Sequence, residues 1–204
     1  MTSLFIIKIP GWRTFVIQQP SFQGLLEFLR RPFHRKSPVV SAIVAGRSDL
    51  AVQLIRKGAI RKNDGALSHA AMRGDLAVVD ALLKAGKDPD EPLHEEHGQG
   101  MTPLMWATNR RFHACMERLL EGGANVNAQA EDGTTAVMCC MSVGQPDDLI
   151  GLEILCRYRP DIAIKDWRGR DLIRVARDRE INSGDPAMRR LLEAYYPDVD
   201  FTPP

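Results

Sequence analysis

The sequence predicts a mainly α-helical solenoid, built from about five helix-turn-helix units that stack on one another in a row. The first observation behind this prediction is a repeated pattern that runs from Gly46 through Leu54 and Ile55 to Gly58. It consists of a glycine, seven residues, an aliphatic pair, two residues and another glycine, and it starts again at Gly74. Units this short cannot bury their own apolar faces, so they are stable only when neighbouring units cover them.

The composition of the chain is the second observation. Of the 204 residues, 44% are hydrophobic but only 6% are aromatic, which favours many small contacts over one large aromatic core. The formal net charge of +1 gives no general attraction to nucleic acid. No apolar run reaches the roughly 18 residues of a membrane span, and the run at residues 4–9 is interrupted by Lys8 and followed by Pro10. We therefore expect a cytoplasmic protein with no membrane insertion.

The residues inside the repeat are specific enough to indicate a family. Residues 101–108 read Met-Thr-Pro-Leu-Met-Trp-Ala-Thr, and residues 117–127 read Glu-Arg-Leu-Leu-Glu-Gly-Gly-Ala-Asn-Val-Asn. This stretch closely resembles the ankyrin repeat, whose pattern runs T-P-L-H-x-A-A and then L-L-x-x-G-A-x-x-N. Weaker copies lie on both sides of it. The resemblance implies an ankyrin-repeat domain at residues 37–196, with units at about 37–64, 65–97, 98–130, 131–165 and 166–196.

Each position of this motif has a structural reason. Thr102 can cap a helix that begins at Pro103, because proline at the first helical position lacks only an amide that would be unpaired anyway. Leu119 and Leu120 lie on the second helix and face the stack, and Gly123 then allows the positive φ with which the chain leaves that helix. None of these positions is catalytic.

The first 36 residues do not match the repeat. Two β-rich runs, residues 4–9 and 12–17, are joined by Pro10 and Gly11 and predict a hairpin, and a short helix is expected near residues 22–31. We expect this segment to be an N-terminal cap that shields the first repeat. Alternatively, the hairpin edge or Trp12 contacts a partner. Residues 197–204 are expected to be a C-terminal tail.

The repeats are unevenly spaced. Gly58 and Gly86 are 28 residues apart, and Gly86 and Gly123 are 37 apart, whereas the typical ankyrin period is about 33. The loop between the first two repeats, around residues 63–65, is therefore expected to be a tight turn instead of a full finger. The surplus falls in the acidic residues 88–100, which form either a contact finger or a plain tolerated loop.

The four cysteines, Cys115, Cys139, Cys140 and Cys156, lie in apolar helical stretches and are expected to be buried and reduced. A metal site that combines them with His113 is conceivable because they fall in adjacent repeats. However, adjacent cysteines on a helix point about 100° apart, and no C-x-x-C pair exists. We expect no metal.

Catalytic motifs are missing from the sequence. His94 and His97 are three residues apart, whereas H-E-x-x-H needs its histidines four apart on a helix to hold one zinc ion. There is no P-loop, no dinucleotide fingerprint and no nucleophile elbow. We predict that the protein is not an enzyme and that it needs no cofactor.

The resemblance implies a partner-binding surface made by the finger tips and by exposed positions near the end of each first helix. Carried over residue by residue, the finger positions are Gln99, Met101, Glu131, Asp132, Thr134, Trp167, Arg168 and Arg170. The helix positions are Met72, Arg73, Asn109, Arg110 and Arg179. Trp106 lies on the same side of its helix or packs beneath it.

Tryptophan and arginine are the side chains most enriched at binding hot spots, so we favour these types within the set. Two alternatives stay open, since Trp106 can belong to the core and exposed arginines can simply be solvated. Residues 157–179 hold seven arginines, whereas residues 88–96 hold five acidic side chains. This bipolar charge favours a partner with an acidic patch.

These patterns lead to three hypotheses about function. The first is a non-enzymatic module that binds a specific protein partner and acts as an adaptor or as an inhibitor, for example an immunity protein that masks a toxin. On its own such a module is expected to be monomeric. The second is a nucleic-acid or anionic-lipid binder that uses the C-terminal arginines. The third is a secreted effector that also acts by binding.

Overall fold

The computed structural model describes residues 5–7, 15–17, 37–93, 99–141 and 148–201. The chain divides into two compact units, residues 1–35 and residues 36–204. His94 and His97, which were compared with zinc ligands above, lie outside the described residues, as do residues 98 and 142–147.

The described part of the first unit is one pair of short strands. Strand β1 (Phe5–Ile7) pairs antiparallel with β2 (Phe15–Ile17), with Ile6 opposite Val16. The turn at residues 10–11 and the helix expected near residues 22–31 lie outside the described residues. A hairpin that caps the repeats is not seen, so the cap remains a prediction.

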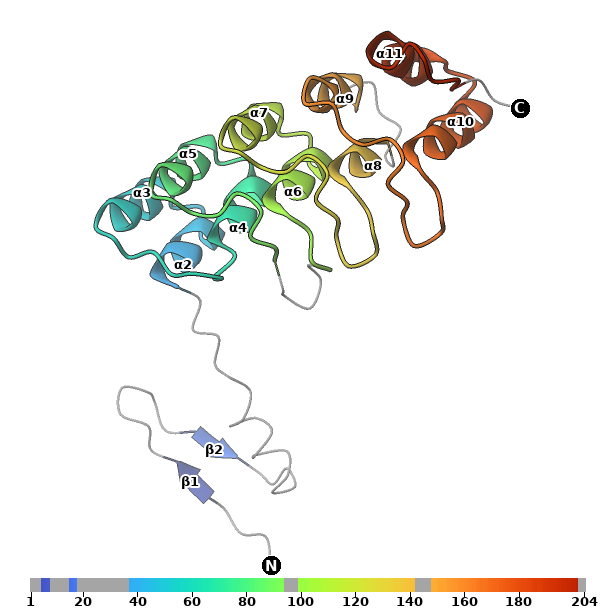
Figure 1. Ribbon diagram of the computed structural model, residues 1–204. Helices are drawn as coiled ribbons and strands as arrows, with labels where there is room; N and C mark the ends of the chain where they lie inside the picture. The colour runs from blue at the N-terminus through green and yellow to red at the C-terminus, as the bar shows by residue number, and fades with distance from the viewer. Residues whose placement is uncertain (1–4, 8–14, 18–36, 94–98, 142–147, 202–204) are drawn as a thin grey trace, which may run out of the picture. The chain divides into compact units, whose positions relative to one another are not determined.

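The second unit is an all-helical array. Its described residues contain five antiparallel helix pairs (Figure 1). The pairs are α2 (Pro38–Val44) with α3 (Ser48–Arg56), α4 (Ala66–Arg73) with α5 (Leu76–Lys84), α6 (Pro103–Asn109) with α7 (His113–Glu121), α8 (Ala136–Met141) with α9 (Asp148–Cys156), and α10 (Leu172–Ser183) with α11 (Ala187–Tyr195).

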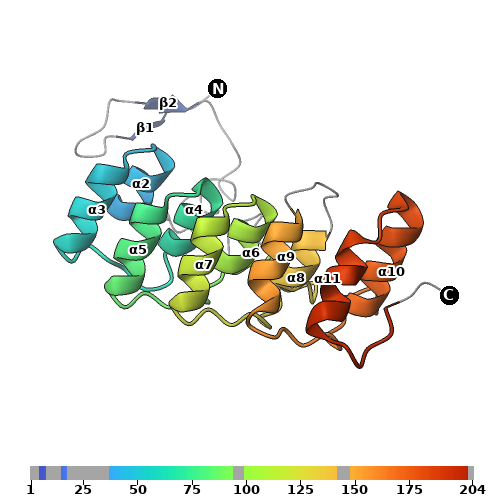
Figure 2. The same ribbon diagram turned by 90° about the horizontal axis from the view of Figure 1, so that it is seen from above.

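The helices of this unit form two layers. Each first helix packs against the first helix of the next repeat, as α4 packs against α2 and α6, and the second helices do the same, as α5 packs against α3 and α7. Figure 2 shows α3, α5, α7, α9 and α11 in one row and the other five helices behind them. The prediction of a helical array is confirmed for the described residues 37–93, 99–141 and 148–201, which contain five helix pairs.

The helix ends follow the motif. The Oγ1 atom of Thr102 accepts a hydrogen bond from the amide of Met105 (3.4 Å), and Pro103 is the first residue of α6. The first two helix pairs turn at Gly46 and Gly74, whose φ angles are +71° and +70°. Only glycine adopts such angles without strain, which is why the repeat pattern begins with this residue.

A continuous apolar core runs between the two layers. Leu82 and Leu119, from the aliphatic pairs, are fully buried, as are the small residues Ala70, Ala71 and Ala107 of the first helices. Alanine at these positions lets neighbouring helices approach closely. Burial of each leucine side chain contributes about 1.5–3 kcal/mol, so the repeated leucines account for much of the stability of the stack.

The end of the array differs from the expected tail. Phe201 is completely buried in the core, and its ring lies 6.4 Å from that of Tyr196. The Tyr196 hydroxyl donates to the carbonyl of Pro160 (2.6 Å), and Arg177 donates to the carbonyl of Asp200 (2.8 Å). Residues 196–201 therefore fold back and cover the last helix pair. A single phenylalanine after the last repeat carries no periodic pattern, so this packing could not be predicted from the sequence.

Candidate partner-binding surface

The loop between α7 and α8 folds into a short finger. The amide of Ala130 donates to the carbonyl of Thr134 (2.9 Å), and the amide of Thr134 donates to the carboxylate of Asp132 (2.9 Å). Gly133 has a φ of +77°, and a Cβ at this position would lie 3.0 Å from the carbonyl of Lys165. The finger therefore has one defined shape and packs closely against the next loop.

The finger between α9 and α10 is organised by one buried carboxylate. The Oδ1 atom of Asp166 accepts from the amides of Arg168 and Arg170, each at 2.9 Å. Its Oδ2 atom accepts from Nε (2.9 Å) and Nη2 (2.7 Å) of Arg170. Burial tends to raise the pKa of Asp166, but these hydrogen bonds outweigh that effect, and the pKa is lowered from its ordinary value of 3.8.

The finger tips are tied to one another. The amide of Glu131 donates to the carbonyl of Gln99 (3.0 Å), and the amide of Trp167 donates to the carbonyl of Asp132 (2.9 Å). The loops project from the same side of the array in Figure 1. Because backbone hydrogen bonds fix this row of tips, binding a partner would require little further ordering of the loops.

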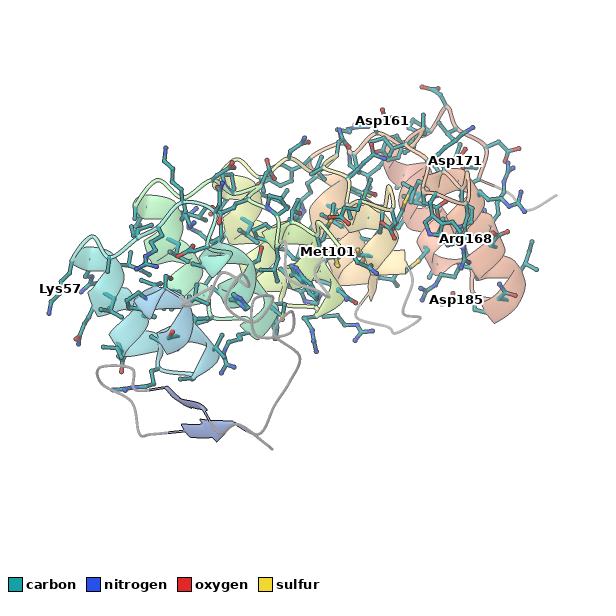
Figure 3. The ribbon with its side chains drawn as sticks, turned by 90° about the horizontal axis from the view of Figure 1, so that it is seen from below. Lys57, Met101, Asp161, Arg168, Asp171 and Asp185 are labelled. Carbon is teal, nitrogen blue, oxygen red and sulfur yellow. The ribbon has the colours of Figure 1, made fainter. Side chains whose placement is uncertain are left out.

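Exposed side chains gather on this row. Trp167 is 67% exposed, and the guanidinium of Arg168 lies 4.7 Å from the centre of its ring, within the range of a cation–π contact. Gln99 and Glu131 are exposed, whereas Met101, Asp132 and Thr134 are half-buried. Figure 3 labels Met101 and Arg168 on the array.

Arg170 has a different place from the other predicted finger residues. Its guanidinium is held by Asp166, and its side chain is 38% exposed. The side chain therefore positions the finger, and only part of it is left to meet a partner.

Four of the five predicted helix positions lie at the turns between first and second helices, whereas Arg179 lies within α10, four residues before its last residue, Ser183. Arg73, Asn109 and Arg110 are exposed, while Met72 and Arg179 are half-buried. The Nη1 atom of Arg73 donates to the carbonyl of Val44 in the preceding repeat (3.5 Å). The turns are at the opposite ends of the first helices from the fingers, so the predicted residues form two separate rows.

For Trp106 the sequence left open whether the side chain faces the partner-binding side of its helix or belongs to the core. Its side chain is half-buried and packs against the core. Its Nε1 atom is shielded from solvent and has no hydrogen-bond acceptor among the described residues. This placement favours a packing role for the ring over direct contact with a partner.

The junction between the first two repeats holds a buried charge cluster that the sequence analysis missed. As expected, the chain makes a tight turn here, with φ of +54° at Asn63 and +66° at Gly65. The Nζ atom of Lys87 lies 2.6 Å from Glu91 and 2.9 Å from Asp64, and it also donates to the carbonyl of Arg61 (2.7 Å).

Glu91 belongs to the acidic loop that was considered as a contact finger. Its Oε1 atom accepts from the amide of Gly65 (2.9 Å), so its charge is used inside the fold. Asp90 of the same loop accepts from the amide of Asn125 at 2.9 Å and 3.1 Å. A lysine and two acids separated in sequence have no motif, so only their packing identifies the cluster.

The chain was compared with models of known protein families. Residues 67–166 match the family described as ankyrin repeats, in three copies. The chain is an ankyrin repeat protein. No catalytic family was found in this comparison, and ankyrin repeats are typically non-catalytic and mediate contacts between proteins.

Two curated proteins resemble this ankyrin repeat protein over part of their length. One is an ankyrin repeat-containing protein of Treponema pallidum (strain Nichols), 34% identical over 109 residues. The other is BCL-6 corepressor-like protein 1 of Homo sapiens, 31% identical over 169 residues. The matches cover 50% and 80% of this chain, but only 35% and 9% of the two relatives.

The structure also describes the four cysteines, which the sequence analysis compared with a metal site. Cys115, Cys139, Cys140 and Cys156 are all buried and free of disulfides. Burial raises the pKa of the thiols of Cys115 to about 11 and of Cys139 and Cys156 to about 12, which makes them poor nucleophiles at neutral pH.

The described residues contain no group of three or more His, Cys, Asp or Glu side chains placed to hold a metal ion. None of the described helices has the length and apolar character that a membrane crossing needs.

Proposed function

We propose that this ankyrin repeat protein binds a specific protein partner through its finger tips and first-helix ends. The observation that carries the proposal is the 67% exposure of Trp167, stacked on Arg168 at the tip of a finger that Asp166 fixes. Keeping a large aromatic side chain in water costs free energy that burial against a partner would recover. Tryptophan and arginine together are also the most frequent hot-spot residues of protein interfaces.

The charge on this surface supports a partner with an acidic patch. Many of the C-terminal arginines already have acidic neighbours, since Arg157 pairs with Glu153 and Arg174 pairs with Asp178. Arg168 has no acidic partner among the described residues. It is therefore the cation of this region most ready to meet a carboxylate. The same pairing counts against the alternative of a nucleic-acid or anionic-surface binder, which needs many free cations.

The role of the interaction is proposed to be that of an adaptor or an inhibitor, of which an immunity-type protein that masks a toxin is one example. The four buried thiols fit a reducing compartment such as the cytoplasm. An inhibitor would form a stoichiometric complex and abolish the activity of its partner. An adaptor would hold two proteins at the same time.

The N-terminal strand pair is proposed to cap the repeats. Solenoids need a polar end that shields the last apolar face. If this is its role, deletion of residues 1–36 will lower the urea midpoint of unfolding of the repeats. If the pair instead contacts the partner, the midpoint will stay the same and binding will be lost.

The proposal is tested by capture of proteins from the native lysate on the immobilised chain, followed by mass spectrometry. We expect a specific protein to be retained by the original chain and lost with Trp167→Ala plus Arg168→Glu. The matched control is Arg56→Glu, an exposed arginine on a second helix. Retention by the double variant, or equal loss with the control, would contradict the proposal. Arg170→Glu is unsuitable because it would also release Asp166.

A further inference from the structure

The turns between first and second helices are equivalent in the first three repeats. In the second repeat the amides of Gly74 and Asp75 donate to the carbonyls of Ala71 and Ala70. In the third repeat the amides of residues 111 and 112 donate in the same way to those of residues 108 and 107. Arg73 and Arg110 therefore occupy the same position in adjacent repeats.

The two arginines carry charge that the described residues do not neutralise. Both are exposed, and neither forms an ion pair with an acidic side chain in the described part of the chain. Arg73 is held in place by its bond to the Val44 carbonyl and by its approach to Gly46, where a Cβ would lie 2.9 Å from Nη2. In the third repeat Phe112, not Arg110, covers the preceding glycine, so Arg110 is free to project.

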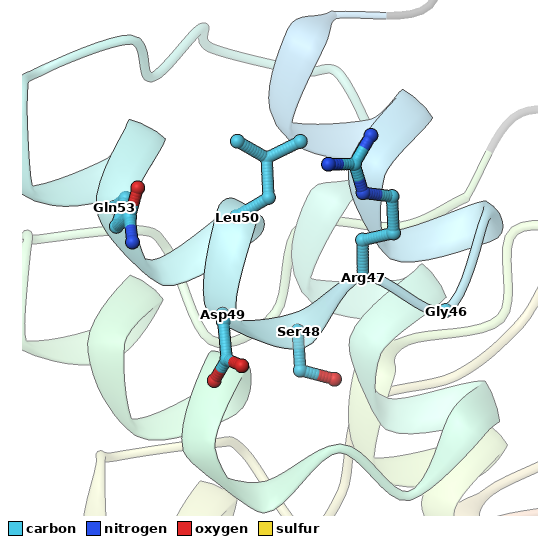
Figure 4. Close-up of a pocket in the computed structure, with 6 residues that line it drawn as sticks. All are labelled: Gly46, Arg47, Ser48, Asp49, Leu50 and Gln53. Carbon is cyan, nitrogen blue, oxygen red and sulfur yellow. The ribbon is translucent and has the colours of Figure 1, made fainter.

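The first repeat extends this charged row. A shallow hollow of about 480 Å³ is lined by Gly46, Arg47, Asp49 and Leu50, together with residues 48 and 53. In Figure 4 the side chains of Arg47 and Leu50 point to one side of the turn, and that of Asp49 points to the other. Gly46 lines the hollow and is also approached by Arg73, so the hollow lies beside the row. We call Arg47, Leu50, Arg73 and Arg110 the turn edge.

Acidic side chains near the turn edge do not cancel its charge. The carboxylate of Asp75 accepts hydrogen bonds from the hydroxyl of Ser48 and from the amide of Val78, which fix its position but leave it charged. Asp49 lines the hollow and points away from Arg47 in Figure 4, so the three arginines of the turn edge outnumber the two nearby carboxylates. The helix dipoles contribute little, because each turn brings the negative end of a first helix next to the positive end of a second helix. The arginines therefore determine the local potential.

We propose that the turn edge binds an extended segment of the partner that carries a carboxylate at every third residue. Packed helices lie about 8–10 Å apart, so equivalent arginines of adjacent repeats are separated by about this distance. A chain extended in the polyproline II conformation has three residues per turn and advances about 3.1 Å per residue, so side chains three residues apart lie on one face and are separated by about the same distance. A bidentate contact between arginine and carboxylate would give both affinity and register.

This inference rests on the proposed function, since it assumes a protein partner, but it concerns a row separate from the fingers. It is tested with two fluorescein-labelled synthetic peptides of about twelve residues and identical composition. One has aspartate at every third position among glycine and serine, and the other has its aspartates consecutive. Fluorescence anisotropy at low salt measures their affinities.

We expect the spaced peptide to bind about tenfold more tightly than its isomer, and Arg73→Glu plus Arg110→Glu to weaken it by about tenfold or more. The matched control is Arg56→Glu plus Arg190→Glu, two exposed arginines on second helices, which should leave the affinity unchanged. Arg73→Gln plus Arg110→Gln should give a smaller loss without introducing repulsion. Because all these positions are exposed, the variants should retain the unfolding midpoint of the original chain.

Three results would overturn the inference: equal binding of the two peptides, equal effects of the two charge-reversal variants, or tighter binding of an oligothymidylate than of the spaced peptide. The outcome is independent of the lysate capture. If a protein is captured through Trp167 while the spaced peptide does not bind, the proposed function stands and the turn-edge inference fails. If the peptide binds as expected while no protein is captured, the preference of the turn edge for spaced carboxylates stands and the proposed contact through Trp167 fails.

Discussion

The junction between the first two repeats and the last finger both depend on an aspartate in a loop, but they use it differently. At the junction Asp64 meets Lys87, whose side chain is only 4% exposed. At the last finger Asp166 meets Arg170, whose side chain is 38% exposed, and the loop continues to the exposed Trp167. The junction thus encloses its charges, while the finger uses a buried carboxylate to hold other side chains outward.

Loop length accounts for this difference. The tight turn at residues 63–65 leaves no room for a tip, so its aspartate points inward at the next repeat. The longer loop at residues 165–170 closes on Asp166 and still has two residues beyond it, Trp167 and Arg168. The same ion-pair chemistry therefore produces a buried charge cluster at the junction and an exposed candidate contact at the finger.

The largest expected effect comes from disrupting the buried charge cluster around Lys87. Lys87→Met removes the cation between Glu91 and Asp64 and leaves two carboxylates without compensation, so we expect a loss of about 3–5 kcal/mol in the free energy of unfolding, measured in urea. Lys84→Met is the matched control, because Lys84 is exposed and pairs with Asp80 at the surface. The control should lose less than about 1 kcal/mol. Equal losses would mean that the buried cluster contributes no more to stability than a surface ion pair.

An intermediate effect is expected at the finger. Asp166→Asn weakens the charge-assisted bonds to Arg170, and we expect a loss of about 1–3 kcal/mol in the free energy of unfolding. Asp161→Asn is the control, since among the described residues the exposed Asp161 carboxylate accepts from one amide, that of Ala163 (2.9 Å). If the two variants lose the same amount, Asp166 does not organise the finger.

The effect of Asp166 should depend on pH in a defined direction. Its pKa is lowered in the folded state, so its contribution is present above the ordinary value of 3.8 and is lost as the pH falls through the lower folded pKa. The difference in unfolding free energy between the original chain and Asp166→Asn should therefore be full at about pH 7 and shrink towards about pH 2. A difference that grows on acidification would have the wrong sign.

A smaller effect is expected at Trp106, where the packing ring carries an unpaired donor. Trp106→Phe keeps an aromatic ring and removes an Nε1–H that has no acceptor among the described residues. The loss of ring volume and the removal of the unsatisfied group act in opposite directions, so the free energy of unfolding should change by less than about 1 kcal/mol. A larger loss would mean that the packing of the indole ring outweighs the removal of the unsatisfied group.

The smallest effect on stability is expected at the tip. Trp167→Ala removes an exposed side chain and should change the free energy of unfolding by no more than about 0.5 kcal/mol. If the tip is a contact, the same variant should lose the partner in the capture experiment. A large loss of stability would assign Trp167 to the fold and not to binding.

The sequence predicted the features that repeat. Leu82 and Leu119, Thr102 with Pro103, and the turn glycines occur at fixed intervals, because every repeat must solve the same packing and capping problem. This regularity predicted the helical array and the family.

The features that occur once could not be predicted. Lys87 and Phe201 are buried only because particular neighbours fold over them, and no pattern in the sequence marks those neighbours. For the candidate surface, the sequence identified which positions lie at tips and turns, but it could not distinguish Arg168, which is exposed at the tip, from Arg170, which is held by Asp166. That distinction depends on the direction of the side chains within one loop.

Hydrogen–deuterium exchange of the chain with and without its captured partner is the most direct test of the proposed binding surface. This surface predicts slower exchange of backbone amides at the finger tips, residues 99–101, 131–134 and 166–170, together with the turn edge. The outer second helices, such as α5 and α9, should exchange at the same rate in both states. Protection confined to those second helices, with unchanged exchange at the tips, would contradict it.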